Sequence, residues 1–563
     1  MKTRPGARAS LLWALVLYAC SSGSQGASNT GDRLDGGSGA YGSGGSDSGA
    51  GAGSTGGANQ GGSNSGGAIG EGTGGSGDAG ASGTSRAGVC TASPPQKGAF
   101  IGVTDVAQGS YPLALGVFCG GSFVAVGEPL DPTVPISLAG PNHATIALPA
   151  TREWVAGFDA NGVATWAAPI ISGSMNEAYF AYVSPVDSGS TFVSGIYGTS
   201  VVFDKGGKNE TTLTAKSSSP SAFVCLYDKA GAFQWAKPLG KANETAILGA
   251  TANHSGTAHL AVNTRDFDGA SIAPGELELT LAQDDGAILA VDATGHFLEA
   301  VKFSETQNRL MFLTELADGG LLAEGAVATS LVLAKGTSKQ TSPSGTFFYA
   351  RFNADLSLDS VKTVSAPTLV PDQTAVAGLP DGSAVFAGDQ IDTSITLGQG
   401  EAHETTLPVV GTKNNGVVAH YGVDGQLLWA VDLGSDSTSD AGAVYVSALT
   451  ATTDGSVWVT GIYALSSSAS NQGNLIVAEG SKHSLSVAIP SGEEASFIVR
   501  LDANGHPVWG TALASSGFLT TDAITSTTDT LVALGAFSGA ATFGTHPVTA
   551  TTKRDMYLAR FGP

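Results

Sequence analysis

The chain has 563 residues, a formal net charge of −22 at pH 7 and 79 glycines. Residues 89–563 carry the whole acidic excess, with 21 lysines and arginines against 43 aspartates and glutamates. Such a surface repels phosphate groups, which disfavours nucleic acid and anionic membrane surfaces as partners. We expect the charge to keep the protein soluble and monomeric.

The first 19 residues have the pattern of a signal peptide for export. Three basic residues precede the apolar run Leu11–Leu17, which is too short to span a membrane as a helix. The run ends in Leu17-Tyr18-Ala19-Cys20, which resembles a bacterial lipobox. The resemblance implies cleavage before Cys20, acylation of that cysteine and, because Ser21 follows, sorting to the outer membrane. A plain secretory signal is the alternative interpretation.

Residues 20–95 comprise, in this interpretation, the lipidated cysteine and a linker. Residues 21–88 contain 26 glycines and a single aromatic residue, Tyr41. A segment of that composition cannot bury enough apolar surface to fold. Its root-mean-square reach is roughly 40–50 Å. The domain that follows, residues 96–563, is therefore expected to be tethered to the outer membrane of a Gram-negative bacterium, outside the cytoplasm.

This domain repeats a phrase in which Asp-x-x-Gly and then Trp follow an apolar strand. Full copies are anchored at Asp159, Asp228 and Asp502, each with Gly three residues later and Trp seven residues later. Alignment of all copies, some of them degenerate, gives the anchor positions Asp159, Asp228, Asp292, Asn353, Gly422, Asp502 and Gly562. Repetition of this kind marks an array of supersecondary units that share one continuous core.

A second phrase, an apolar strand that ends in Gly and is often preceded by Asp-Gly, lies between the anchors. Its last position falls at Gly127, Gly195, Asn263, Gly325, Gly388, Gly461 and Gly535. Asp-Gly favours tight hairpin turns, and the apolar runs are rich in β-branched and aromatic residues. About four strands in each of seven copies predicts an all-β fold, a seven-bladed β-propeller.

The ends of the domain predict how the ring closes. The last copy stops at Phe561-Gly562-Pro563, before its Trp-bearing strand. Trp509 precedes Gly535 by 26 residues, and Ile101 precedes Gly127 by the same number. The segment Ala99–Val103 is therefore expected to supply the missing strand of the seventh blade, which leaves no open edge.

The two phrases together resemble the bacterial SBBP-type β-propeller repeats, a family of secreted and surface proteins, over residues 98–563. The resemblance implies a propeller outside the cytoplasm and no single activity. We infer a binding or interaction module for a surface glycan or protein, with no cofactor. Two alternatives stay open: a polysaccharide hydrolase or lyase with paired carboxylates around the channel, and a purely structural envelope protein.

Export permits disulfides, and four cysteines are present. With Cys20 assigned to the lipid, Cys90 at the domain edge and Cys119 in the first copy are the expected pair. Cys225 lies inside an apolar strand and is expected to be a buried free thiol.

Chemical motifs are scarce in the sequence. The chain contains no His-Glu-x-x-His and no Cys-x-x-Cys, and we expect no metal site and no catalytic residue. The Asp of each Asp-x-x-Gly is expected to cap its own turn. The Trp residues of the repeat are expected to pack between blades, and a carbohydrate platform is the alternative.

One column of the repeat is a candidate binding site. Two residues before the anchor, four consecutive copies carry a basic or imidazole side chain: Arg351, His420, Arg500 and Arg560. If these side chains point into the channel, they form an arc that binds a carboxylate or sulfate of an acidic glycan. If they point between blades, they form structural ion pairs, which is the interpretation that we favour.

Overall fold

The computed structural model describes residues 99–562, except for segments of one to eight residues, most of them in connections between strands. These residues belong to one compact unit, Gly77–Pro563, and their regular elements are all strands. Within this part of the chain, no helix has the length and apolar character needed to cross a bilayer. The signal peptide, the linker, Cys20, Cys90 and Cys119 lie outside the described residues.

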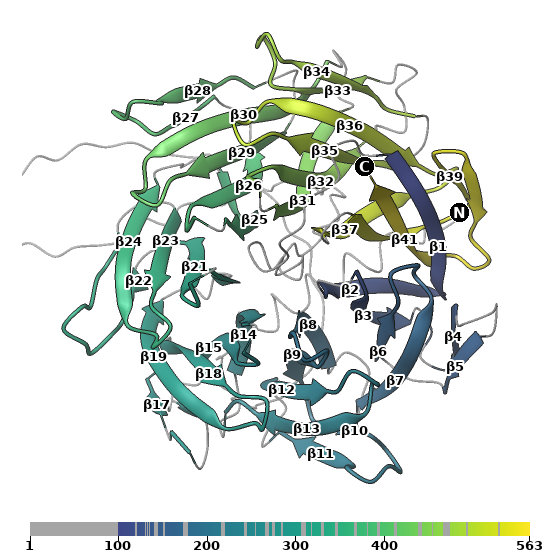
Figure 1. The fold of residues 1–563 in the computed structure, drawn as a ribbon, viewed down its shortest axis with the longest axis vertical. Helices are drawn as coiled ribbons and strands as arrows, with labels where there is room; N and C mark the ends of the chain where they lie inside the picture. The colour runs from purple at the N-terminus through teal and green to yellow at the C-terminus, as the bar shows by residue number, and fades with distance from the viewer. Residues whose placement is uncertain are drawn as a thin grey trace, which may run out of the picture. The chain divides into compact units, whose positions relative to one another are not determined.

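Seven four-stranded antiparallel sheets surround a common centre, as predicted (Figure 1). From the innermost strand outward, blade 1 contains β2 (Ser110–Val117), β3 (Phe123–Pro129), β6 (Glu153–Phe158) and β7 (Ala164–Ser172). Blade 2 contains β8 (Ala178–Pro185), β9 (Thr191–Tyr197), β12 (Ser221–Tyr227) and β13 (Phe233–Pro238). Blade 3 contains β14 (Thr245–Ala252), β15 (Ala258–Thr264), β18 (Asp285–Val291) and β19 (Phe297–Glu305).

The remaining blades follow in chain order. Blade 4 contains β20 (Met311–Glu315), β21 (Leu321–Ala326), β23 (Phe347–Phe352) and β24 (Leu358–Val364). Blade 5 contains β25 (Leu369–Gly378), β26 (Ala384–Gln390), β29 (Asn415–Tyr421) and β30 (Leu427–Ser435). Blade 6 contains β31 (Ala443–Ala451), β32 (Val457–Ala464), β35 (Glu494–Leu501) and β36 (Pro507–Ala514). Blade 7 contains β37 (Leu519–Ser526), β38 (Leu531–Phe537), β41 (Asp555–Gly562) and β1 (Ala99–Gln108).

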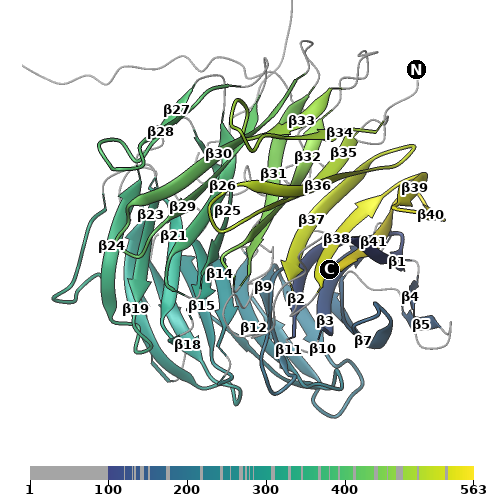
Figure 2. The same ribbon diagram turned by 45° about the horizontal axis from the view of Figure 1, so that its top comes forward.

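The ring closes as the sequence predicts, because β1 from the start of the domain forms the outermost strand of blade 7 (Figures 1 and 2). It pairs antiparallel with β41, in a register that runs from Ala99 opposite Gly562 to Gln108 opposite Asp555. Hydrogen bonds between the two ends of the domain thus remove the open edge that a linear array would leave.

Short outer strands, which the repeat count did not predict, occur along the chain between the second and third strands of each blade. They are β4 (Ile136–Ala139), β5 (Thr145–Leu148), β10 (Ser200–Phe203), β11 (Thr211–Thr214), β16 (Ala270–Ile272), β17 (Leu279–Leu281), β22 (Leu331–Val332), β27 (Ile395–Leu397), β28 (Thr405–Leu407), β33 (Asn474–Val477), β34 (Leu485–Ala488), β39 (Ala540–Phe543) and β40 (His546–Thr549). Several extend the sheet of the preceding blade: β10 pairs with β7, β22 with β19, and β33 with β30. The outer hairpins therefore link neighbouring blades by backbone hydrogen bonds.

The turn between the third and fourth strands of a blade, here called the anchor turn, explains the Asp-x-x-Gly phrase. Asp159 Oδ1 accepts the backbone N–H groups of Asn161 and Val163, at 2.8 and 2.9 Å. The same pair of bonds recurs at Asp228, Asp292 and Asp502. Gly162 has a φ of 80°, which only glycine adopts without a steric cost. The expectation that each Asp caps its own turn is confirmed.

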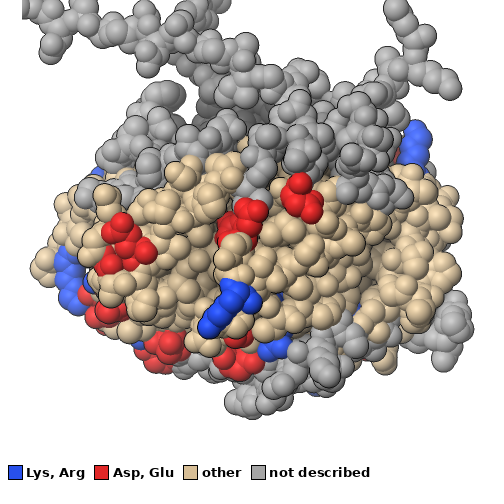
Figure 3. Space-filling model, turned by 90° about the horizontal axis from the view of Figure 1, so that it is seen from above, with Lys and Arg blue, Asp and Glu red and all other residues tan. Residues whose placement is uncertain are grey.

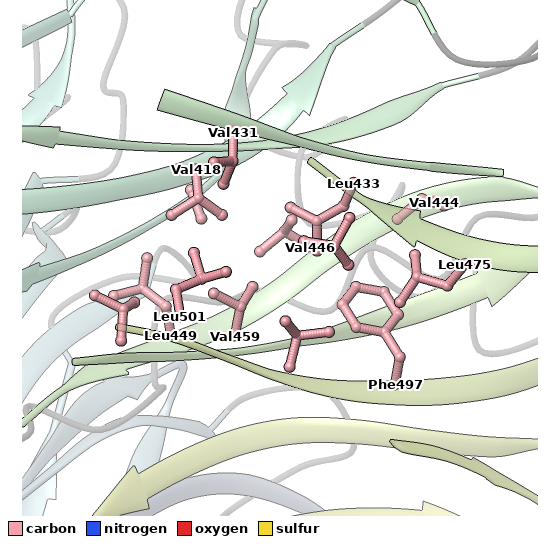
Figure 4. Close-up of a cluster of buried hydrophobic side chains, with 14 of the residues drawn as sticks. Val418, Val431, Leu433, Val444, Val446, Leu449, Val459, Leu475, Phe497 and Leu501 are labelled. Atoms are coloured by element: carbon pink, nitrogen blue, oxygen red, sulfur yellow. The ribbon is translucent and has the colours of Figure 1, made fainter. Parts of the chain in front are cut away.

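Apolar side chains fill the spaces between neighbouring sheets. In one cluster Val418 and Val431 of blade 5 face Val446, Val459 and other residues of blade 6 (Figure 4). All seven residues of β12 are buried, so this strand is packed on both faces. Burial of each Val or Leu side chain stabilises the fold by about 1.5–3 kcal/mol. The apolar interfaces between blades therefore stabilise the ring.

Candidate functional site

The four residues of the basic column occupy equivalent places at the ends of the third strands of blades 4 to 7. Arg351 lies in β23, His420 in β29, Arg500 in β35 and Arg560 in β41. Each stands at the end of its strand that lies beside the inner turn, the tight turn between the first and second strands of a blade. The contacts of each side chain decide between the two interpretations of the column.

Arg351 is held by two carboxylates and points toward the next blade. Its Nη2 donates to Asp318 in the inner turn of blade 4, and its Nε lies 3.7 Å from Asp359 Oδ2 on β24. Its other Nη atom lies against Gly382 in the inner turn of blade 5, so closely that a Cβ there would clash. The charge is therefore paired by carboxylates of its own blade, while the side chain packs against the next blade.

His420 is buried and neutral. Its Nε2 lies 2.8 Å from Ser383 Oγ, and its ring meets the indole of Trp429 edge-on, with centroids 5.4 Å apart. Burial lowers the pKa of His420 to about 4, against a smaller opposing effect of Asp381. At neutral pH it therefore offers no positive charge to an anionic ligand.

Arg500 forms the most buried ion pair of the column, with 6 % of its surface exposed. Its Nη2 donates to Asp454 Oδ2 at 3.3 Å and to Ser456 Oγ at 3.0 Å. The guanidinium also lies 5.6 Å from the ring centroid of Trp458, a cation–π contact. Burial raises the pKa of Asp454, and hydrogen bonds together with the charge of Arg500 bring it below its usual value.

The repeat tryptophans of blades 2 and 5 join their blades to the next, as predicted. Trp235 Nε1 donates to the carbonyl oxygen of Ala293, and Trp429 Nε1 donates to that of Ala503, both at 2.9 Å. In each case the acceptor directly follows the Asp of the next blade's anchor turn. The indoles therefore serve blade-to-blade packing.

Arg560 makes the equivalent link across the closure of the ring. Its Nη1 donates to the carbonyl oxygen of Ala160 at 2.7 Å, and Ala160 directly follows Asp159 in the anchor turn of blade 1. Burial lowers the pKa of Arg560, and the charge of Asp159 opposes that shift. Arg351 and Arg500 thus form structural ion pairs of the kind that we favoured, Arg560 bonds a backbone carbonyl, and anion binding by the column stays a prediction.

Two buried carboxyl groups, which the sequence analysis did not single out, lie in the second strands of blades 4 and 5. Burial raises the pKa of Glu324 and Asp389 well above the usual range, with an opposing hydrogen bond at Asp389. The signal in the sequence was a carboxylate inside an apolar run, as in Leu321-Leu322-Ala323-Glu324-Gly325-Ala326. Such a residue is a candidate for function because desolvation shifts its protonation.

These two carboxyl groups lie on opposite sides of the sheet of blade 5. Glu324 stands opposite Tyr349 in the register of blade 4, and Tyr349 donates to the carbonyl oxygen of Gly422 in blade 5. Cross-strand partners share a face of a sheet, so Glu324 faces blade 5. Asp389 Oδ1 accepts the N–H of Val446 at 2.8 Å and so faces blade 6. The two groups cannot act on one glycosidic bond.

In the view of Figure 3, the described acidic and basic side chains are scattered over a mostly uncharged surface, and no large patch of one sign is visible. Among the described residues, no group of three or more His, Cys, Asp or Glu side chains is arranged to hold a metal ion. Cys225 is buried and forms no disulfide, as expected. The predicted Cys90–Cys119 bridge and the lipid on Cys20 fall outside the described residues.

Comparison with known proteins identifies no family. No family model matches the chain, and no curated protein matches it. Among solved structures, an ulvan lyase of a new polysaccharide lyase family is 9 % identical, with a TM-score of 0.32 over 83 % of this chain and 95 % of that one. The Bacteroides ovatus xyloglucan PUL protein GH43B is 9 % identical, with a TM-score of 0.24 over 83 % and 96 %. A lignostilbene dioxygenase of Pseudomonas brassicacearum is 10 % identical, with a TM-score of 0.26 over 68 % and 90 %. Likeness this distant carries no functional argument.

Proposed function

We propose that this protein is a lipoprotein of the outer membrane whose β-propeller binds a surface glycan or protein. The lipobox-like Leu17-Tyr18-Ala19-Cys20 and the glycine-rich residues 21–88 support a lipid anchor followed by a flexible tether. A closed ring of seven blades carries connections at its two ends, and loops on a rigid scaffold are where binding residues are disproportionately found.

One observation favours binding over hydrolysis. A glycosidase of the common type needs two carboxyl groups about 5–10 Å apart on either side of one bond. Glu324 and Asp389, the two carboxyl groups whose pKa burial raises well above the usual range, face different interfaces on either side of blade 5. Among the described residues, the acidic groups that burial perturbs most therefore do not converge on one substrate.

A glycan array with the soluble Cys20→Ala variant tests the proposal. We expect saturable binding to one class of surface polysaccharide, or to an envelope protein in a matched pull-down, without cleavage of the bound chain. Release of reducing ends or unsaturated sugars from that polysaccharide would instead establish the hydrolase or lyase alternative. Absence of any binding, with envelope integrity lost on deletion of the protein, would establish the structural alternative.

A further inference from the structure

Two histidines meet at the outer edge of blade 6. His483 lies in the turn between β33 and β34, and His506 lies in the anchor turn between β35 and β36. Their ring centroids are 4.0 Å apart, with an angle of 31° between the ring planes. Both side chains are accessible from solvent: His483 is exposed, and 42 % of the His506 side chain is exposed.

A carboxylate orients one of the two rings. His506 Nδ1 lies 3.2 Å from Asp502 Oδ2, while Asp502 Oδ1 is fixed by the backbone N–H groups of Asn504 and His506. This arrangement directs the Nε2 atom of His506 away from the turn. Histidines that bind metals commonly donate their other ring N–H to a carboxylate, which fixes the tautomer and makes the ring a better ligand.

Blades 3 and 5 lack this contact, although each has a histidine at one of the two positions. In blade 3 the residue equivalent to His506 is His296, beside Asp292, but the facing outer hairpin carries Glu276, which accepts the N–H of Phe297 at 2.6 Å. In blade 5 the residue equivalent to His483 is His403, and the position of His506 is occupied by Gln426. Blades 3 and 5 therefore each have one half of the pair.

The residue after His506 explains why the two imidazoles meet. In blades 3 and 5, Phe297 and Leu427 donate their backbone N–H groups to Glu276 and Glu401 of the facing hairpin turn. Pro507 occupies this position in blade 6 and has no N–H to donate. A carboxylate at this point would be unpaired, and imidazole rings occupy the space instead.

We propose that His483 and His506 form a binding site for a divalent transition-metal ion of the Zn²⁺, Ni²⁺ or Cu²⁺ class. Imidazole nitrogen suits these ions, which bind it at about 2.0–2.1 Å in the case of zinc. A rotation of the exposed His483 side chain brings both Nε2 atoms to one ion, and water molecules complete the coordination. Asp502 is a positioning residue that acts through His506, and the acidic surface raises the local concentration of cations.

Calorimetric titration of the full chain with ZnCl₂, purified without a polyhistidine tag and treated with chelator, tests the site. We expect one saturable zinc ion per chain. His483→Ala and His506→Ala should each weaken binding at least about tenfold, and Asp502→Asn, which keeps the turn-capping oxygen, about 10- to 100-fold. His296→Ala and His403→Ala are the matched controls and should leave zinc affinity unchanged.

Gln426→His provides the converse test. It places a second histidine opposite His403 in blade 5, but Glu401 still accepts the N–H of Leu427 there and Gly422 stands where blade 6 has the orienting Asp502, so the stoichiometry should stay at one zinc ion. Zinc binding that persists in His483→Ala, the lack of a saturable site in the parent chain, or a second zinc ion bound by Gln426→His would each overturn the proposal. Thermal melting of every variant without metal checks that the fold is retained.

Discussion

Arg560 donates a hydrogen bond to the carbonyl oxygen of Ala160, 2.7 Å away, and this bond joins the last blade to the first. Between blades 2 and 3 and between blades 5 and 6, the equivalent carbonyl is bonded by the indole of a tryptophan in the preceding blade. The register of blade 7 places Gly102 opposite Arg560, where the outermost strands of blades 1, 2, 5 and 6 carry the tryptophan. The guanidinium thus supplies, at the closure of the ring, the donor that the indole supplies at those two junctions.

Arg560→Gln should weaken the closure, because the shorter side chain cannot reach Ala160. We expect a loss of about 1–2 kcal/mol in the free energy of unfolding, since the donor is charged but partly exposed. Trp235→Phe is the comparison, because it keeps an aromatic ring but removes the donor to Ala293, and it should cost about 1 kcal/mol. Urea denaturation measures both, and an Arg560→Gln midpoint equal to that of the parent would contradict the assigned role.

Arg500→Gln should be more destabilising than Arg351→Gln, although both residues form ion pairs at the same repeat position. The Arg500 side chain is 8 % exposed against 25 % for Arg351, and their partners Asp454 and Asp318 are 38 % and 58 % exposed. We expect the free energy of unfolding to fall by about 1–3 kcal/mol in Arg500→Gln and by under about 1 kcal/mol in Arg351→Gln. Equal stability of Arg500→Gln and parent, with weaker binding of an acidic glycan, would support the anion-binding interpretation instead.

Asp432 should make the protein less stable as the pH rises. Burial, assisted by the charge of Glu479, raises the pKa of Asp432 to about 6 in the folded state, against about 3.9 when unfolded. The folded state therefore binds the proton more tightly, so this contribution to stability is complete below about pH 4 and is lost between about pH 4 and 6.

The variant Asp432→Asn removes this dependence. It should raise the free energy of unfolding by about 2–3 kcal/mol at pH 7.5 and leave it nearly unchanged at pH 4. Chemical denaturation at the two pH values makes the comparison, with the exposed Glu479→Gln as a control of smaller effect. A loss of stability in Asp432→Asn at pH 7.5 would show that the ionised carboxylate stabilises the fold.

Much of the ring could be predicted because its rules are local. The turn of Asp159 is closed by hydrogen bonds within five residues, so the same residue types recur wherever that turn recurs. The closure was also predictable, since the position of Ala99–Val103 relative to Gly127 repeats the offset of a complete blade.

Contacts between distant segments were harder to predict. The short outer strands have different sequences in different blades, and β22 has only two residues. The partner of Arg560 lies 400 positions away, and only the closed ring brings the two together. Similarly, nothing in the local sequence shows that Glu324 and Asp389 face different interfaces, because the facing of a residue depends on the register of its strand.

Counting reactive thiols tests the prediction that Cys90 and Cys119 form a disulfide. The thiol of Cys225 is buried, and burial raises its pKa well above the usual value, so the folded protein should not react with a thiol reagent at Cys225. After denaturation without reductant, we expect one reactive thiol in the mature domain if Cys90 and Cys119 form the predicted bridge. Three reactive thiols would rule out that bridge.

Fractionation of cells that express Cys20→Ala tests most directly whether the propeller is a binding module held at the membrane by a lipid. We expect the parent protein and its ligand-binding activity to sediment together with the outer membrane. In the variant, both should move to the soluble fraction, with the affinity for the ligand unchanged, because the propeller folds independently of the anchor. A Cys20→Ala protein that stays in the membrane fraction, or that loses binding on release, would contradict this function.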